Sequence, residues 1–223
     1  MSKLSAILVA SLIATAGAAS ATTMPLIDGT TTYTITTPAD KTTTITLPSK
    51  QSAGVVLDFD FSFTGALQNN DFFGVFFGNA NGPSFGLKAN CGGTTGCTND
   101  LYLRMNNNHN FYLSNSNVSA GVNYHLMGYL HKTGNSSGAY NALDMWLNPT
   151  EEEMRTLTGA NASITGASGF ASFNSVGFRT VNISNGMSLT ASDLNVSAVP
   201  EPASLAILGL GLAGLAAARR RRK

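Results

Sequence analysis

Charged residues are scarce in this sequence. Its 223 residues include 13 basic and 12 acidic side chains, which is 11% of the chain, whereas an average soluble domain has about 25%. The last five residues, Arg219 to Lys223, supply five of the basic ones. Between Thr22 and Val199, seven basic residues stand against eleven acidic ones, so the formal net charge of this body is −4. An acidic body is a poor partner for nucleic acid, and we expect no such binding.

Groups that carry out catalysis are scarce as well. The only glutamates of the body are consecutive, at 151–153, and the whole chain has three histidines. His125 and His131 alternate with Met127 and Tyr129, so we expect them to face solvent or a groove rather than to form a triad. The sequence contains no nucleophile elbow, phosphate-binding loop or zinc motif. It therefore predicts a protein that is not an enzyme and has no cofactor.

Asp58 and Asp60 are the basis of the alternative, a glycoside-active enzyme. Strict alternation from Leu57 to Phe63 places both carboxylates on one face of a strand, with backbones about 6.5–7 Å apart. This spacing is compatible with the carboxylate pair of a retaining glycosidase. A solvated polar face or a calcium ligand explains the pair more simply, so we favour the non-catalytic interpretation.

The N-terminus has the parts of a secretory signal peptide. Lys3 precedes an uncharged, mostly apolar run from Leu4 to Ala18, and Ala19-Ser20-Ala21 supplies the small residues that signal peptidase requires. We predict cleavage after Ala21. Residues 1–21 are then a signal peptide, and the protein is exported.

The C-terminus combines a short motif, an apolar segment and a basic cluster. As a helix, the sixteen uncharged residues 203–218 span about 24 Å, short of the roughly 30 Å hydrocarbon core, but snorkelling flanks let such a segment dock in a membrane. The cations should stay in the cytoplasm, which places the body on the opposite side. The motif is Pro200, Glu201 and Pro202, and the cluster is Arg219, Arg220, Arg221, Arg222 and Lys223.

This order of parts over residues 199–223 resembles the PEP-CTERM sorting signal of Gram-negative bacteria. The resemblance implies recognition by an exosortase, with a transmembrane helix that holds the precursor briefly at the inner membrane. It also implies that the mature protein ends at the cell surface or in the extracellular matrix. An ordinary single-span anchor is the alternative.

Residues 22–198 are expected to form a single all-β domain. The Thr-rich segment from Thr30 to Thr46 predicts two edge strands that Pro38 and Pro48 close. The apolar run Phe72–Phe77 predicts a central strand, and the alternation of residues 57–63 predicts a half-buried one. We expect further strands at 84–88, 101–105, 110–113, 124–131, 142–147, 175–180 and 189–196.

One short helix interrupts the strands. Thr150 and Glu153 form a capping-box pattern, which predicts a helix from Glu151 to about Leu157. Many short strands and one helix predict a two-sheet antiparallel β-sandwich.

Several segments resemble the concanavalin A-like jelly-roll domains of exported bacterial proteins. They are residues 57–61, 86–91, 144–149 and 175–180. The resemblance implies a sandwich of the lectin and glucanase type, with a concave face that binds carbohydrate in some relatives.

Candidate ligand residues follow from side-chain chemistry. A carbohydrate site combines an aromatic platform with carboxylates and amides, and Asp58, Asp60, Asp144, Trp146 and Asn148 are the candidates for an exopolysaccharide. Tyr102, Tyr112, Tyr124 and Tyr129 are further aromatic candidates, although a tryptophan between Met145 and Leu147 is also typical of a core.

Calcium is the first cofactor to consider from the composition. Asn69, Asn70, Asp71, Asn99 and Asp100 are oxygen ligands in turn-rich segments, but they follow no spaced loop motif. Cys91 and Cys97 are predicted to form a disulfide that shapes a small loop, because exported proteins oxidise their cysteine pairs.

Overall fold

The computed structural model describes residues 23–29, 33–35, 40–90, 98–106, 109–113, 116, 118–134, 138–183 and 186–199. The predicted signal peptide, Cys91 and Cys97, the Pro200 to Pro202 motif, the apolar segment and the C-terminal arginines lie outside these ranges. Within the ranges, no helix is long and apolar enough to cross a membrane.

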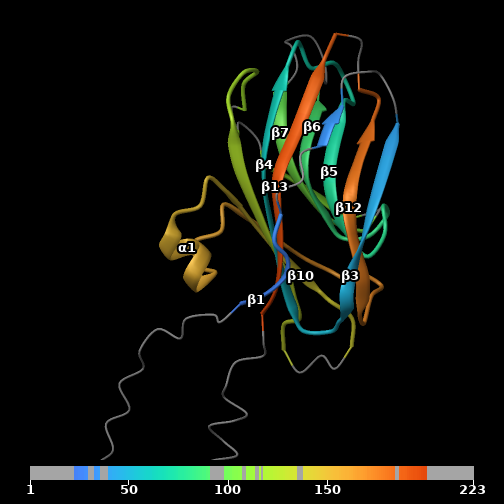
Figure 1. Ribbon diagram of the computed structural model, residues 1–223, viewed down its shortest axis with the longest axis vertical. Coiled ribbons are helices and arrows are strands. Elements are labelled where there is room, and N and C mark those ends of the chain that lie inside the picture. Colours follow the sequence, from blue (N-terminus) through green and yellow to red (C-terminus); the bar gives the residue numbers. More distant parts are fainter. Residues whose placement is uncertain are drawn as a thin grey trace, which may run out of the picture.

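Two antiparallel sheets pack face to face (Figure 1), which confirms the predicted sandwich. One sheet has the order β1 (Met24–Ile27), β13 (Ser188–Val199), β4 (Gly54–Thr64), β9 (Tyr124–His131), β10 (Ala142–Leu147) and β11 (Ala162–Thr165), and β2 (Tyr33–Ile35) also pairs with β13. The other has the order β3 (Lys41–Gln51), β12 (Phe173–Val181), β5 (Phe72–Phe77), β6 (Ser84–Asn90), β7 (Thr98–Asn106) and β8 (His109–Leu113). We call them the seven-stranded and the six-stranded sheet.

Strand β4 shows how the sequence builds the interior. Leu57, Phe59, Phe61 and Phe63 are buried between the sheets, whereas the residues between them point outward. The Phe59 ring centre lies 5.8 Å from the rings of Phe73 and Phe85 and 6.0 Å from that of Phe178, which belong to the facing sheet. Aromatic contacts across the gap therefore join the two layers. The predicted half-buried strand is confirmed.

Strand β5 is buried on both faces, as its apolar run predicted. All six of its residues are buried, and it lies between β12 and β6 in the six-stranded sheet. Its outward residues are covered by side chains of its neighbours: the Phe72 ring packs on Tyr102, 4.9 Å between centres. A central strand with cover on both sides needs no polar face.

Helix α1 (Glu151–Thr156) begins and ends as the sequence indicates. Thr150 Oγ1 accepts from the Glu153 backbone N–H, and the Glu153 carboxylate accepts from the Thr150 N–H, which completes the capping box. Leu157 ends the helix in a left-handed conformation, with φ 54°. The segment after it, with Leu157 and Ala160, packs on the outer face of the seven-stranded sheet.

Three local expectations were wrong or incomplete. Pro48 does not close a strand, because β3 continues through it to Gln51. The pairing with β12 shifts register between Phe173 and Ser175, opposite Gln51 and Thr46, and β3 is an edge strand, so the missing N–H of Pro48 breaks no regular ladder. The short edge strands β1 and β11 were not predicted.

The interior rings should dominate stability. Phe59→Ala is expected to lower the free energy of unfolding by about 3–5 kcal/mol, because it leaves a cavity among four aromatic neighbours. Phe111→Ala on β8, where the residue is 42% exposed, is the matched control and should cost less than about 1 kcal/mol. Denaturant unfolding measures both, and equal losses would contradict the assignment of Phe59 to the interior.

Candidate functional site

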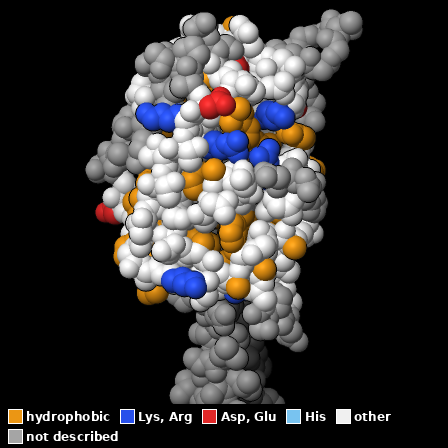
Figure 2. Space-filling model, turned by 90° about the vertical axis from the view of Figure 1, so that its right-hand side faces the viewer, with side chains coloured by type: hydrophobic (Ala, Val, Ile, Leu, Met, Phe, Trp, Pro, Cys, Tyr) orange, Lys and Arg blue, Asp and Glu red, His pale blue; other side chains and the backbone are white. Residues whose placement is uncertain are grey.

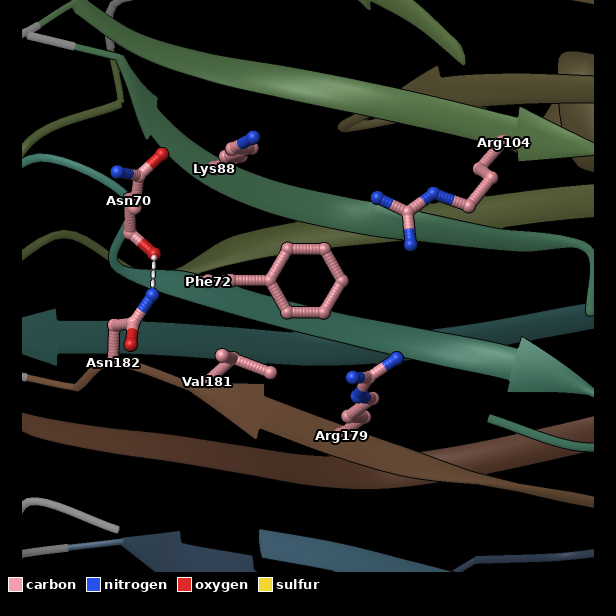
Figure 3. Close-up of a pocket in the computed structure, with 7 residues that line it drawn as sticks. All are labelled: Asn70, Phe72, Lys88, Arg104, Arg179, Val181 and Asn182. Carbon is pink, nitrogen blue, oxygen red and sulfur yellow. Dashed lines mark hydrogen bonds between the residues drawn. The ribbon is translucent and has the colours of Figure 1, made fainter. Parts of the chain in front are cut away.

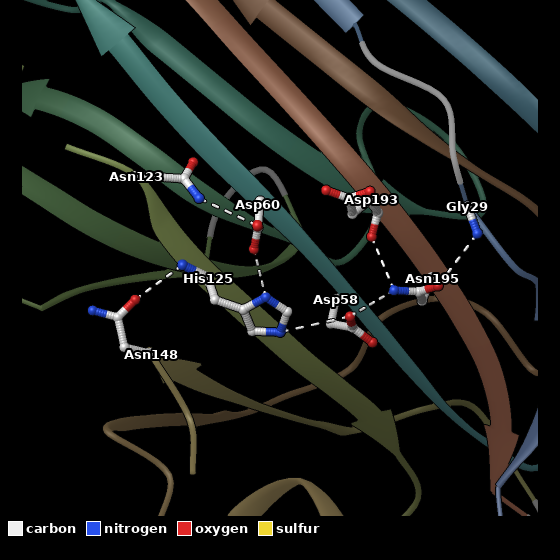
Figure 4. Close-up of polar contacts among 8 residues, drawn as sticks. All are labelled: Gly29, Asp58, Asp60, Asn123, His125, Asn148, Asp193 and Asn195. Carbon is white, nitrogen blue, oxygen red and sulfur yellow. Dashed lines mark hydrogen bonds and ion pairs between the residues drawn. The ribbon is translucent and has the colours of Figure 1, made fainter. Parts of the chain in front are cut away.

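A polar network lies on the outer face of the seven-stranded sheet (Figure 4). The Asp60 carboxylate is 2.6 Å from His125 Nδ1, and Asp58 Oδ1 is 3.6 Å from Nε2 of the same ring. Asn195 donates from its amide to Asp58 over 3.1 Å, and Asn123 donates to Asp60 over 3.2 Å. We call these five residues the Asp–His network.

Strand register brings the network together. Asp60 is paired with His125 across β4 and β9, and Asp58 is paired with Asn195 across β4 and β13. Beyond β13, Asn195 Oδ1 accepts from the Gly29 N–H over 3.2 Å. The network therefore ties three neighbouring strands and the segment after β1 to one another.

A bulge in β13 positions the amide of Asn195. Regular pairing with β4 is interrupted between Ser192 and Asn195, and Asp193 has a φ of 53°. The Asn195 amide also donates to the Asp193 carbonyl over 2.9 Å. The bulge aims this side chain at Asp58, as bulges beside polar sites often do.

Within the Asp–His network, the surroundings shift the pKa of Asp58. Burial raises the pKa of Asp58 above its ordinary value, because a desolvated carboxylate is disfavoured. The hydrogen bond from Asn195 and the charge of His125 act in the opposite direction, and the negative charge of Asp60 again raises the pKa. The net direction is upward, so solvent exclusion prevails over the favourable partners.

This geometry differs from that of a glycosidase pair. Two carboxylates that attack a sugar must face its anomeric carbon from opposite sides. Here the imidazole of His125 lies between Asp58 and Asp60 and contacts both (Figure 4). The space that a sugar ring would occupy is filled by a side chain of the protein. The arrangement is suited to joining strands.

A second histidine–aspartate pair lies further along the same face. His131 Nε2 is 2.8 Å from Asp144 Oδ2, and the Tyr129 ring stacks on His131 with 4.4 Å between centres. Burial raises the pKa of Asp144, but hydrogen bonds from His131 and Ser163 and the charge of His131 outweigh it, so the pKa lies below its ordinary value. Both histidines share the outer face, as their alternation predicted.

Of the two alternatives for Trp146, the structure shows the core position and not a binding platform. Its side chain is fully buried with Val56, Met127 and Val199, and its indole N–H donates to the Thr158 carbonyl over 2.9 Å. The segment that follows α1 covers it. Trp146 does share the outer face with Asp58 and Asp144, but the covering segment makes its ring part of a second, small core.

Asn148 serves the backbone rather than a ligand. Its side-chain oxygen accepts from the His125 N–H over 2.9 Å, and its own N–H donates to the His125 carbonyl over 2.7 Å. Among the tyrosine candidates, Tyr102 and Tyr124 are buried, whereas Tyr112 and Tyr129 are partly exposed. Neither Trp146, Tyr102 nor Tyr124 offers a ring face to a sugar.

Two of the calcium candidates, Asp71 and Asp100, have different hydrogen-bond partners, and the side chain of Asn99 lies outside the described residues. Asp100 is in register with Lys88 and Phe72, so it points to the outer face, whereas Asp71 precedes Phe72 and points to the opposite one. Asp71 Oδ2 accepts from the Gln68 N–H, and Asp100 Oδ2 accepts from the Asn90 amide. In the described ranges, no three His, Cys, Asp or Glu residues are grouped as metal ligands.

A pocket that was not predicted from the sequence lies on the opposite side of the molecule. It has a volume of about 200 Å³ and lies on the outer face of the six-stranded sheet (Figure 3). Its walls come from β5, β6, β7 and β12, from the turn before β5 and from the residue after β12. The lining residues are Asn70, Phe72, Lys88, Arg104, Arg179, Val181 and Asn182, which we call the basic pocket. A sequence signal existed: three of the seven cations of the body occupy outward positions on predicted strands.

Comparison with protein families matches residues 198–222 to the PEP-CTERM protein-sorting motif. The chain carries a PEP-CTERM sorting motif. Its precursor is therefore exported, passes through the membrane and is processed by an exosortase. The matched region begins at the last two residues of β13, so the sorting motif directly follows the sandwich.

Comparison with curated proteins finds no significant match. Among solved structures, a carbohydrate esterase of the Shiga toxin-encoding bacteriophage phi24B is 11% identical, with a TM-score of 0.45 over 81% of this chain and 100% of that one. A glycosyl hydrolase family 16 protein from Mycobacterium smegmatis is 10% identical, with a TM-score of 0.40 over 69% and 67%. The CBM2 module of the evolved Dit of Lactobacillus casei BL23 phage J-1 is 14% identical, with a TM-score of 0.40 over 67% and 64%.

The partners of Asp58 should shift its pKa in opposite directions. His125→Gln and Asn195→Ala are each expected to raise it further, because they remove groups that favour the carboxylate, whereas Asp60→Asn should lower it. Carbon-13 NMR titration of the carboxyl group measures all three. A fall in the pKa after His125→Gln would contradict the network.

Asp144 should make stability depend on pH. Its pKa is lowered in the folded state, so its contribution is present above the ordinary pKa of aspartate and is lost as the pH falls through the lower, folded value. Asp144→Asn should reduce the free energy of unfolding by about 1 kcal/mol at pH 7, and by progressively less as the pH falls through the folded pKa. Asp28→Asn, at an exposed carboxylate, is the control and should show no such difference in unfolding experiments.

Proposed function

We propose that this chain is a non-catalytic protein of the cell surface or extracellular matrix, which an exosortase releases or attaches after processing its C-terminus. The observation that carries the proposal is the position of the sorting motif at 198–222. Signal peptidase and exosortase would be its processing enzymes, and its stay in the inner membrane would be transient.

The boundary between the sandwich and the motif favours this order of events. Val199 ends β13 and is still paired with Gly54 of β4. Pro200 and Pro202 follow at once in the sequence, and proline cannot donate to a strand ladder, so the motif is poorly suited to continuing the pairing of β13. A cut near the motif would leave all of β13 with its neighbours.

The Asp–His network supports the non-catalytic part of the proposal. His125 occupies the gap between Asp58 and Asp60, and the amide of Asn195 engages Asp58 from the other side. Each carboxylate is thereby committed to holding strands together.

A carbohydrate-binding, lectin-like module is the second candidate function. The observation that favours it is the basic pocket, a hollow on a sheet face with amides at one end and cations around its rim (Figure 3). This function is compatible with delivery to the surface, since a displayed module would meet polysaccharide there.

Replacing the motif tests the sorting proposal. The variant Pro200→Ala, Glu201→Ala, Pro202→Ala keeps the length, the apolar segment and the basic cluster, and it should accumulate as unprocessed precursor in the membrane fraction. Immunoblotting of cell fractions measures the size and location of the product, with Lys50→Ala at an exposed site of β3 as the control. Full processing and unchanged surface level of the motif variant would overturn the proposal.

A further inference from the structure

The basic pocket concentrates positive charge on an otherwise acidic body. Lys88 comes from β6, Arg104 from β7 and Arg179 from β12, and all three line one hollow. None of its lining residues is acidic. Within the described chain, none of these three cations forms an ion pair. Figure 2, which views the molecule from its β3–β12 side, shows lysine and arginine side chains gathered there with hydrophobic side chains between them.

We propose that the basic pocket binds the carboxylate of an acidic sugar residue, such as a uronic acid within a polysaccharide. This inference deepens the carbohydrate-binding candidate and rests on it, whereas it is independent of the sorting proposal. It names the charge and the chemical class of the ligand.

Each arginine is held by hydrogen bonds from part of its guanidinium group and has further N–H donors that bond to no described residue. Arg104 donates from Nε to the Asn110 side chain over 2.6 Å, and Arg179 donates from one terminal nitrogen to the Ala80 carbonyl over 3.1 Å and to Asn81 over 3.3 Å. Both terminal nitrogens of Arg104 and one of Arg179 make no hydrogen bond to described residues. Planar guanidinium groups with free N–H donors match the two oxygens of a carboxylate.

The Phe72 side chain lines the pocket, and the buried Tyr102 ring lies behind it. The Phe72 and Tyr102 rings pack together, and the Arg104 guanidinium lies 5.5 Å and 5.6 Å from their centres. The Tyr102 hydroxyl packs against Gly74, where a Cβ would collide with it. These packed rings hold the Arg104 guanidinium in place before the ligand arrives, which lowers the entropy cost of binding.

Two amides at one end of the pocket favour a hydroxyl-bearing ligand. Asn182 donates to the Asn70 carbonyl over 3.4 Å, and both residues have positive φ values, 56° and 68°. The Asn70 side-chain amide makes no hydrogen bond to described residues, and Asn70 lies at one end of the pocket (Figure 3). An amide supplies both a donor and an acceptor, which is what sugar hydroxyls need.

The size of the pocket and the net charge of the body narrow the range of possible ligands further. A volume of about 200 Å³ is below the roughly 300–1,000 Å³ that encloses a drug-sized ligand, so the pocket would hold one residue of a longer chain. Binding to duplex DNA would need many phosphate contacts, and the body has a net charge of −4. A single acidic sugar residue fits both the small volume of the pocket and the acidic body around it.

The experiment measures binding of polygalacturonate to the full chain in detergent. All variants carry glutamine in place of Arg219, Arg220, Arg221 and Arg222, so that the tail adds little binding of anions. The double variant Arg104→Gln, Arg179→Gln should bind polygalacturonate at least tenfold more weakly, because two charge-assisted contacts are lost. Lys50→Gln, Arg155→Gln is the matched control with the same change of charge away from the pocket, and it should bind as tightly as the parent.

A second pair of measurements separates carboxylate recognition from simple attraction of charge. Arg104→Lys, Arg179→Lys keeps the charge but not the planar fork, so its binding should also fall, by about threefold or more. Thermal unfolding checks that every variant is folded. Free galacturonate should compete with the polymer at a higher concentration, whereas inorganic phosphate, dextran and duplex DNA should not compete.

Several results would overturn the inference. Undiminished binding by the Arg104→Gln, Arg179→Gln variant, equal weakening in the control, or equal competition by phosphate or DNA would each do so. Binding of dextran but not of polygalacturonate would overturn the acidic ligand and leave the carbohydrate-binding candidate standing. If neither polysaccharide bound, both the acidic-sugar inference and the carbohydrate-binding candidate would be overturned.

Discussion

The packing of phenylalanine rings between the two sheets is the constraint on which the rest of the molecule depends. Phe59 meets rings from the facing sheet at about 6 Å. Because neighbouring residues of a strand point to opposite faces, fixing Phe59 inside fixes Asp58 and Asp60 outside. The same parity on β6 and β7 turns Lys88 and Arg104 outward while their neighbours Leu87 and Leu103 stay in the core. Both polar faces are thus consequences of one buried layer.

Much of the fold follows from local patterns in the sequence. Alternation identified β4, an apolar run identified β5, and Thr150 with Glu153 identified the start of α1. The patterns failed where pairing decides the outcome. Pro48 lies in an edge strand beside an irregular register, which no single-strand pattern can show. Strands β1 and β11 have four residues each, too few for a periodicity, and they exist because a neighbouring strand offers free hydrogen-bonding groups.

The sites were less predictable than the strands, because they depend on which strands become neighbours. Alternation gave the shared face of Asp58 and Asp60, but only the order β13–β4–β9 places Asn195 and His125 beside them. The sequence left Trp146 open between core and binding platform, because its cover comes from a segment that follows α1. The cations of the basic pocket come from three strands that are distant in sequence. Their outward positions were visible, but their convergence was set by sheet order.

One consequence of the sheet order concerns timing. β13 lies between β1 and β4, so the last described strand of the chain separates two early ones. A chain that crosses a membrane from its N-terminus delivers β13 last, and until then β1 has no partner in the sheet and one edge of β4 is unpaired. The twelve residues of β13 therefore determine when the seven-stranded sheet can be completed. The seven-stranded sheet is complete only after β13 has crossed, and the sorting motif is the segment that crosses next.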